Sequence, residues 1–186
     1  EERDQLRADI LAVAVSDPRL AARYNALVSS ANIHVVRFTG TGTRSRAMEI
    51  IPVNAENGRG TSTRVLIEAG NRPLPDRTPN NPRTRIAHEL LSHSYDADRG
   101  TKDTDVDPAS GIADYEVAAT QVENIYRDAV GMEVRSHYGS RPVPPVTPSR
   151  RRALRGDGVS LTGGTGNTCD GRRAGSCGSG FDRRPC

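Results

Sequence analysis

The order of hydrophobic and polar residues over positions 4–28 predicts two short helices. In residues 4–15 apolar residues recur three and four positions apart, which places them on one face of an α-helix. Asp17 followed by Pro18 is typical of the start of a second helix, because aspartate caps the first turn and proline is tolerated within it. The residues expected on the inner faces of the two helices are Leu6, Ile10, Leu11, Ala14, Leu20, Tyr24, Leu27 and Val28.

The pattern then changes to one that is typical of strands. Three runs rich in β-branched and apolar residues, 33–38, 47–53 and 64–68, are separated by Gly, Asn and Thr. These runs predict a small sheet of about three strands. The segment 71–82 contains four prolines and predicts an extended loop.

Helical spacing returns at residues 83–99, with Gly100 as the expected stop, and again at residues 112–130, closed by Gly131. The inner residues expected on the first of these helices are Ile86, Leu90 and Leu91. Together the elements predict an α+β fold in which N-terminal helices, a small sheet and two later helices share one core.

Residues 140–186 are rich in Pro, Arg and Gly and contain scarcely any large apolar residue. Such a segment cannot bury enough surface to offset the entropy lost on ordering. We therefore expect a domain at 1–139 and a largely disordered tail at 140–186. All three cysteines, Cys169, Cys177 and Cys186, fall in this tail, so none can cross-link the domain.

Charge and hydropathy narrow the possible partners. Residues 141–186 hold nine arginines and three aspartates, a net charge of +6, so residues 1–140 carry −3 of the total of +3. A mildly acidic domain argues against a nucleic-acid-binding core. No apolar run approaches the roughly 18 residues of a membrane span. Because the chain starts without a methionine or an apolar leader, we expect a fragment in which an export signal is not visible.

The candidate chemistry lies in the stretch HELLSHSYD, residues 88–96. In the zinc-peptidase motif H-E-x-x-H, two histidines four residues apart share one face of a helix and the glutamate acts as a base. Here His88 and His93 are five residues apart, which on a regular α-helix separates them by about 140°. A π-turn, which adds one residue to a helical turn, would bring the two imidazoles together. We expect this bulge within residues 90–92, with the Ser92 hydroxyl satisfying a freed carbonyl.

A catalytic zinc ion needs three protein ligands and one open position. The helix expected at 112–130 offers four carboxylates: Asp114, Glu116, Glu123 and Asp128. Glu116 and Glu123 are two helical turns apart, so one of them can bind the metal while the other holds the second nitrogen of a histidine. A different pair, Glu89 and His93, fits a regular helix but leaves no general base.

The order of residues over 83–139 resembles that of small bacterial effector metallopeptidases, which type III systems inject into host cells and some of which cleave host MAP kinases. The shared pattern is HEL, H, YD, G, E-x-x-x-T, E-N-x-x-R and G-x-x-x-R-x-x-Y. The matching residues are His88, Glu89, His93, Tyr95, Asp96, Gly100, Glu116, Thr120, Glu123, Asn124, Arg127, Gly131, Arg135 and Tyr138. The departure is the additional residue, because that family reads H-E-x-x-H. The spacing H-E-x-x-x-H is similar to that of dipeptidyl peptidase III, a zinc enzyme whose third ligand is a glutamate on a later helix.

The resemblance implies a zincin-like domain with one Zn²⁺ per chain. We expect His88, His93 and Glu116 as ligands, with Glu123 as the alternative third ligand, and Glu89 as the base. Asn124, Arg127 and Arg135 are expected to support the site. An oxyanion needs a hydrogen-bond donor from Arg135, His137 or Tyr138, and the resemblance favours Tyr138.

These expectations indicate a zinc-dependent endopeptidase, a secreted or translocated bacterial effector or toxin domain. Its partner would be a protein or peptide substrate. The resemblance implies that this substrate is a host signalling protein. The alternative is a zincin that has lost activity with the additional residue and binds a protein instead. Glu89 favours activity, because a purely structural metal site does not need it.

Overall fold

The computed structural model describes residues 1–75 and 77–147, and it has the mixed α+β fold that the sequence predicts. The elements are α1 (Glu2–Ala14), α2 (Pro18–Val28), β1 (His34–Thr39), β2 (Arg46–Glu49), the 3₁₀-helix η1 (Pro52–Ala55), β3 (Thr63–Glu68), α3 (Pro82–His88), η2 (Glu89–Ser94), α4 (Tyr95–Arg99), α5 (Asp114–Ala129), β4 (His137–Tyr138) and β5 (Arg141–Pro142). The expected sheet of three strands is confirmed. Its order is β1-β3-β2, with β1 parallel and β2 antiparallel to the central strand.

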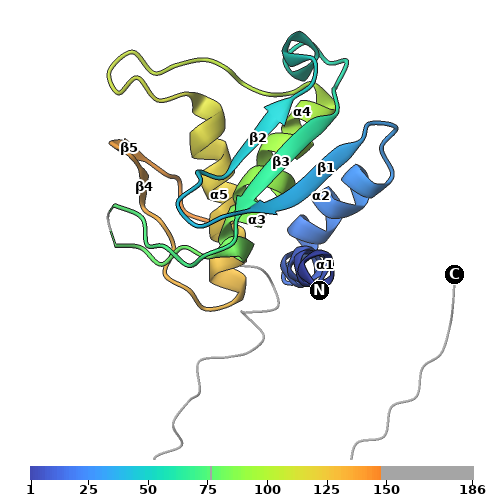
Figure 1. Ribbon diagram of the computed structural model, residues 1–186. Coiled ribbons are helices and arrows are strands. Elements are labelled where there is room, and N and C mark those ends of the chain that lie inside the picture. The colour runs from blue at the N-terminus through green and yellow to red at the C-terminus, as the bar shows by residue number, and fades with distance from the viewer. Residues whose placement is uncertain (76, 148–186) are drawn as a thin grey trace, which may run out of the picture. The chain divides into compact units, whose positions relative to one another are not determined.

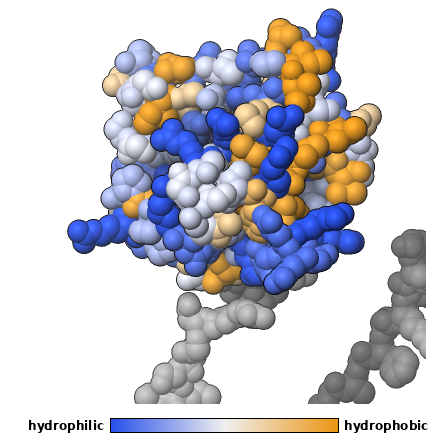
Figure 2. All heavy atoms as spheres, in the orientation of Figure 1, coloured by the Kyte–Doolittle hydropathy of each residue, from blue (hydrophilic) through white to orange (hydrophobic). Residues whose placement is uncertain are grey.

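Helices cover one face of the sheet, while the opposite face has no such cover in the described part of the chain (Figure 1). Val65 and Ile67 of β3 are fully buried, in contact with α3 and η2. On the opposite face Arg37, Arg64 and Val35 are exposed. Figure 2 shows hydrophobic and hydrophilic residues side by side in this view. The core therefore lies between the sheet and the helices, and α5 packs on the far side of α3.

Local signals place the helix starts correctly. The Asp17 side chain accepts a hydrogen bond from the backbone N–H of Arg19, and Pro18 occupies the first turn of α2. Asn81 caps α3 through a reciprocal pair of hydrogen bonds with Thr84. Side-chain caps satisfy backbone donors that the helix itself leaves unpaired, so these starts depend on neighbouring residues alone.

Two residues expected on inner helical faces lie outside. Leu11 is 39% exposed and Val28 is 66% exposed, whereas Val13 is fully buried. Both misplaced residues lie within a turn of a helix end, where the packed face is narrow and the spacing pattern has few residues to define it.

The second predicted strand is shorter than expected. It ends at Glu49, and the side chains of Ile50, Ile51 and Val53 are exposed. Pro52 explains the early end, because proline has no N–H to donate to a strand ladder; it begins η1 instead.

The predicted domain boundary at Gly139 lies too early in the chain. Val143 is 8% exposed, and β5 pairs with β4. The Arg141 guanidinium donates to the Ile112 carbonyl at 3.1 Å and also pairs with Asp114. The rest of the predicted tail, from 148 on and with all three cysteines, lies outside the described residues. None of the helices in 1–75 and 77–147 has the length and apolar character that crossing a membrane requires.

Replacing Val143 tests the corrected boundary. Val143→Ala should lower the free energy of unfolding by about 1.5 kcal/mol, because two buried methyl groups are lost. Val134→Ala is the matched control, since Val134 is 47% exposed and its replacement should change little. Urea unfolding of both variants gives the comparison. Equal, small effects would return the boundary to Gly139.

Candidate metal centre

One wide turn interrupts the helix that carries the two histidines. The chain is helical without a break from Pro82 to Arg99, and the middle segment, η2, is a π-helix over Glu89–Ser94. His88 directly precedes the π-turn and His93 lies within it. The predicted bulge is therefore confirmed. Gly100 ends the helix at φ 68°, where a Cβ would lie 2.6 Å from the Gly58 Cα, so only glycine fits.

A chain of hydrogen bonds joins the π-turn to strands β3 and β1. The Ser94 hydroxyl donates to the Glu89 carbonyl at 3.1 Å and accepts from the Thr63 hydroxyl at 2.9 Å. The chain continues to β1, where His34 Nδ1 lies 2.9 Å from the Thr63 Oγ1 and Nε2 lies 3.2 Å from Asp98. The Ser94 hydroxyl thus adds a side-chain hydrogen bond to the Glu89 carbonyl at the start of the π-turn.

The expectation for Ser92 was wrong. Its hydroxyl makes a long contact of 3.5 Å with the Asp96 carboxylate and does not reach a carbonyl. Ser94 takes this role because the wider turn places a residue five positions on, rather than three or four, next to the carbonyl of Glu89.

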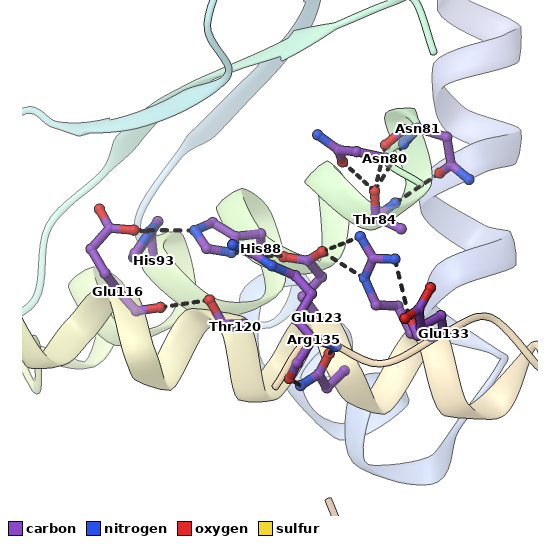
Figure 3. A network of polar contacts seen from close by, with 12 residues as sticks. Asn80, Asn81, Thr84, His88, His93, Glu116, Thr120, Glu123, Glu133 and Arg135 are labelled. Atoms are coloured by element: carbon purple, nitrogen blue, oxygen red, sulfur yellow. Dashed lines mark hydrogen bonds and ion pairs between the residues drawn. The ribbon is translucent and has the colours of Figure 1, made fainter. Parts of the chain in front are cut away.

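The π-turn brings His88 and His93 to a common point with Glu116, in the first turn of α5. The two rings are 4.9 Å apart at an angle of 84°. The Glu116 Oε2 lies 3.3 Å from His88 Nε2 and 3.7 Å from His93 Nε2 (Figure 3). Ligand atoms at about 2.1 Å from a tetrahedral ion are separated by about 3.4 Å, so this group could hold a metal ion.

Glu89 does not belong to this group. The alternative pair, Glu89 with His93, required an undistorted helix, which η2 is not. The Glu89 side chain is largely buried in the same cleft, and the backbone N–H of Ala47 donates to its carboxylate. Burial raises the pKa of Glu89, which makes its carboxylate a stronger base than an exposed one.

Glu123 holds the other nitrogen of His88. Its Oε2 lies 3.2 Å from His88 Nδ1, while the guanidinium groups of Arg127 and Arg135 donate to the carboxylate at 2.7 and 3.1 Å. Burial by itself would raise the pKa of Glu123, but the hydrogen bond from His88 and the two arginines lower it to about 2. The carboxylate is therefore ionised and fixes the orientation of the imidazole.

Asn124 anchors the segment that supplies Arg135. Its side-chain amide donates to the Arg135 carbonyl and its side-chain oxygen accepts from the Arg135 N–H, both at 2.7 Å. Four residues named by the sequence pattern thus come together on the side of His88 away from Glu116. These four residues are Glu123, Asn124, Arg127 and Arg135.

The paired carboxylates also set the charge of His88. Burial would lower the pKa of this imidazole, but its hydrogen bonds to Glu116 and Glu123 raise it to about 10. The pKa of Glu116 is held well below its usual range; burial opposes this shift, and hydrogen bonds to the two histidines outweigh it. Without a metal ion, His88 therefore carries a proton that it shares with the two carboxylates. A metal ion that binds this imidazole must displace the proton.

Tyr138, on β4, lies against the group. Its ring stacks on His88 with centroids 6.1 Å apart. Burial, followed by the charge of Glu116, raises the pKa of Tyr138, so the phenol remains a donor. Of the other two donors considered, Arg135 is committed to Glu123, and His137 is exposed beside Ser136.

The group opens into a cleft of about 790 Å³ that also contains residues which sequence analysis missed. Tyr115 packs edge-on against His93 at 5.3 Å, and Lys102 lies 4.3 Å from the centre of the Tyr115 ring. Strand β2, the loop between β1 and β2, and the loop after β3 form the remaining wall. No local pattern marks these residues, because only the fold brings them to the cleft.

Comparisons with known proteins add no assignment. No protein-family model matches the chain, and no curated protein matches it.

The support behind the π-turn can be tested with two serine variants. Ser94→Ala removes the hydroxyl that bonds both the Thr63 hydroxyl and the Glu89 carbonyl, which should lower the free energy of unfolding by about 1–3 kcal/mol. Ser92→Ala removes only the long contact to Asp96 and should cost clearly less. Chemical unfolding of the two variants measures the difference. If Ser92→Ala costs as much as Ser94→Ala, the assignment to Ser94 is wrong.

Proposed function

We propose that this chain is a zinc-dependent endopeptidase with a zincin-like site, in which His88, His93 and Glu116 hold the ion. The observation that carries the proposal is the π-turn. It brings the His88 and His93 imidazoles close to the Glu116 carboxylate, and Glu89 lies in the same cleft. Two histidines and one glutamate are a common ligand set of catalytic zinc and leave a position open. Glu123, on the opposite nitrogen of His88, is the carboxylate that such histidines usually need.

The residues of the chain divide the chemistry among them. When bound, a zinc ion supplies a Lewis acid that lowers the pKa of water to about 7 and polarises a carbonyl. Glu89 accepts the proton of the attacking water and delivers it to the leaving nitrogen, and its raised pKa suits both steps. Tyr138 donates its hydroxyl proton in a hydrogen bond to the developing oxyanion.

Strand β2 supports a peptide as the substrate. It is an edge strand, paired with β3 on one side only. The Ile50 N–H donates to the Ser62 carbonyl, so the backbone groups of every second residue before Ile50 also point toward β3. Three positions earlier, the backbone groups of Ala47 point away from β3 and toward Glu89. An extended peptide can pair with an edge strand of this kind and lie across the metal group.

The resemblance over 83–139 supports a role as an effector or toxin domain. Half of the residues that carry it line one cleft, although they come from α3, η2, α5, β4 and the segment before β4: His88, Glu89, His93, Glu116, Glu123, Arg135 and Tyr138. The protein would then be secreted or translocated and would cleave a protein of the target cell, such as a signalling protein.

Removing the base separates metal binding from catalysis. Glu89→Ala should keep about one zinc per chain and lose peptide hydrolysis by about 100-fold or more, because general-base catalysis contributes that much. Metal analysis and a peptide-library digest of wild type and variant provide the measurements. A wild type that holds zinc but cleaves nothing would favour the alternative, a protein-binding zincin without activity.

A pair of glutamate variants tests the ligand assignment. Glu116→Ala should strip the zinc, whereas Glu123→Ala should weaken zinc affinity by about 10- to 100-fold, the usual effect of losing a carboxylate behind a ligand. Glu133→Ala serves as the control, since this residue is exposed and lies four residues beyond the end of α5. Titration with a chromophoric chelator gives the affinities, and the reverse order would make Glu123 the ligand.

A further inference from the structure

Two loops form one end of the cleft and carry several arginines. The first loop, 40–45, joins β1 to β2, and the second, described over 69–75 and 77–81, joins β3 to α3 (Figure 1). The cleft is lined here by three arginines, which together are called the basic end: Arg44, Arg46 and Arg72. None of the three takes part in the proposed metal chemistry.

The buried carboxylate of Glu68 contacts both loops and holds them together. It accepts a hydrogen bond from the Gly42 N–H at 2.7 Å, and its Oε2 lies 3.3 Å from guanidinium nitrogens of both Arg72 and Arg85. The Glu68 N–H in turn donates to the Ser45 hydroxyl at 2.9 Å. The basic end is therefore held in place by a buried network and is not a chance meeting of surface side chains.

This network leaves positive charge unbalanced. Glu68 is the only carboxylate among the described lining residues of this part of the cleft, and Arg72 and Arg85 already share it. Arg44 and Arg46 are exposed and have no ion pair within the described part of the chain. The other carboxylates that line the cleft, Glu89, Glu116 and Glu123, belong to the metal group and its surroundings.

The position of the basic end relates it to the substrate path. Arg46 directly precedes Ala47, the residue whose outward backbone groups face Glu89, and Arg44 lies three residues before it. Paired strands advance together at about 3.3 Å per residue, so a peptide along β2 passes the basic end within about one to three residues of the peptide bond that faces Glu89.

We infer that the basic end is a subsite for an acidic side chain, so that the preferred substrates carry Asp or Glu about one to three residues from the scissile bond. This inference deepens the proposed function and rests on it. Guanidinium groups suit the task, because their planar fork donates to a carboxylate in two parallel hydrogen bonds. Since Glu68 already fixes the loops, little ordering is needed when the substrate binds.

A binding experiment tests the subsite without requiring cleavage. The probes are short fluorescein-labelled peptides that differ only in having glutamate, glutamine or lysine at the same positions. Fluorescence anisotropy with zinc-loaded Glu89→Ala protein should show the glutamate peptide binding about fivefold more tightly than the glutamine peptide. The double variant Arg44→Glu/Arg46→Glu should reverse the order and favour lysine. Zinc content confirms that the double variant is folded.

Arg64→Glu is the matched control, because Arg64 is an exposed arginine of the same sheet that does not line the cleft. It should keep the preference for glutamate. Equal binding of the glutamate and glutamine peptides, or a loss of preference in Arg64→Glu as large as in the double variant, would overturn the subsite. A wild type that cleaves peptides without such a preference overturns the subsite alone. A preference for glutamate in a protein that cleaves nothing supports the subsite and overturns the peptidase.

Discussion

The candidate site depends on one additional residue in one helical turn. On a regular helix His88 and His93 would point about 140° apart, and no side-chain rotation would bring them to one ion. The π-turn removes this separation and places the rings 4.9 Å apart. A chain of hydrogen bonds through Ser94, Thr63, His34 and Asp98 joins the Glu89 carbonyl in this turn to the sheet and α4. The sheet thereby fixes the geometry of the metal group.

Buried charge is the second constraint on the site. A carboxylate deprived of water is strongly destabilising unless cations and hydrogen-bond donors surround it. Glu123 is 3% exposed and is surrounded by Arg127, Arg135 and His88; Glu68 is 2% exposed and is surrounded by Arg72, Arg85 and the Gly42 N–H. The first arrangement orients an imidazole and the second orients two loops. Both hold the walls of the cleft rigid before any ligand is present.

Short-range signals in the chain were reliable guides. Asp17, Pro18 and Gly100 placed helix ends correctly, because caps and left-handed turns involve only adjacent residues. Burial was less predictable. Leu11 and Val28 have the right spacing but lie outside, and Val143 lies inside a segment whose composition suggested disorder. Whether an apolar residue is covered depends on which element packs beside it, and spacing along one element does not contain that information.

The sequence by itself determined that two histidines five residues apart within one helix could share an ion only across a widened turn. It also named the carboxylates within reach. It could not decide which carboxylate faces which nitrogen, because Glu116 and Glu123 differ by only about 20° around α5. The tertiary structure decided this by the angle at which α5 crosses the π-turn, with Glu116 against both Nε2 atoms and Glu123 against Nδ1 of His88. The loops around Glu68 were likewise decided by tertiary structure, since their contacts join residues that no periodic pattern relates.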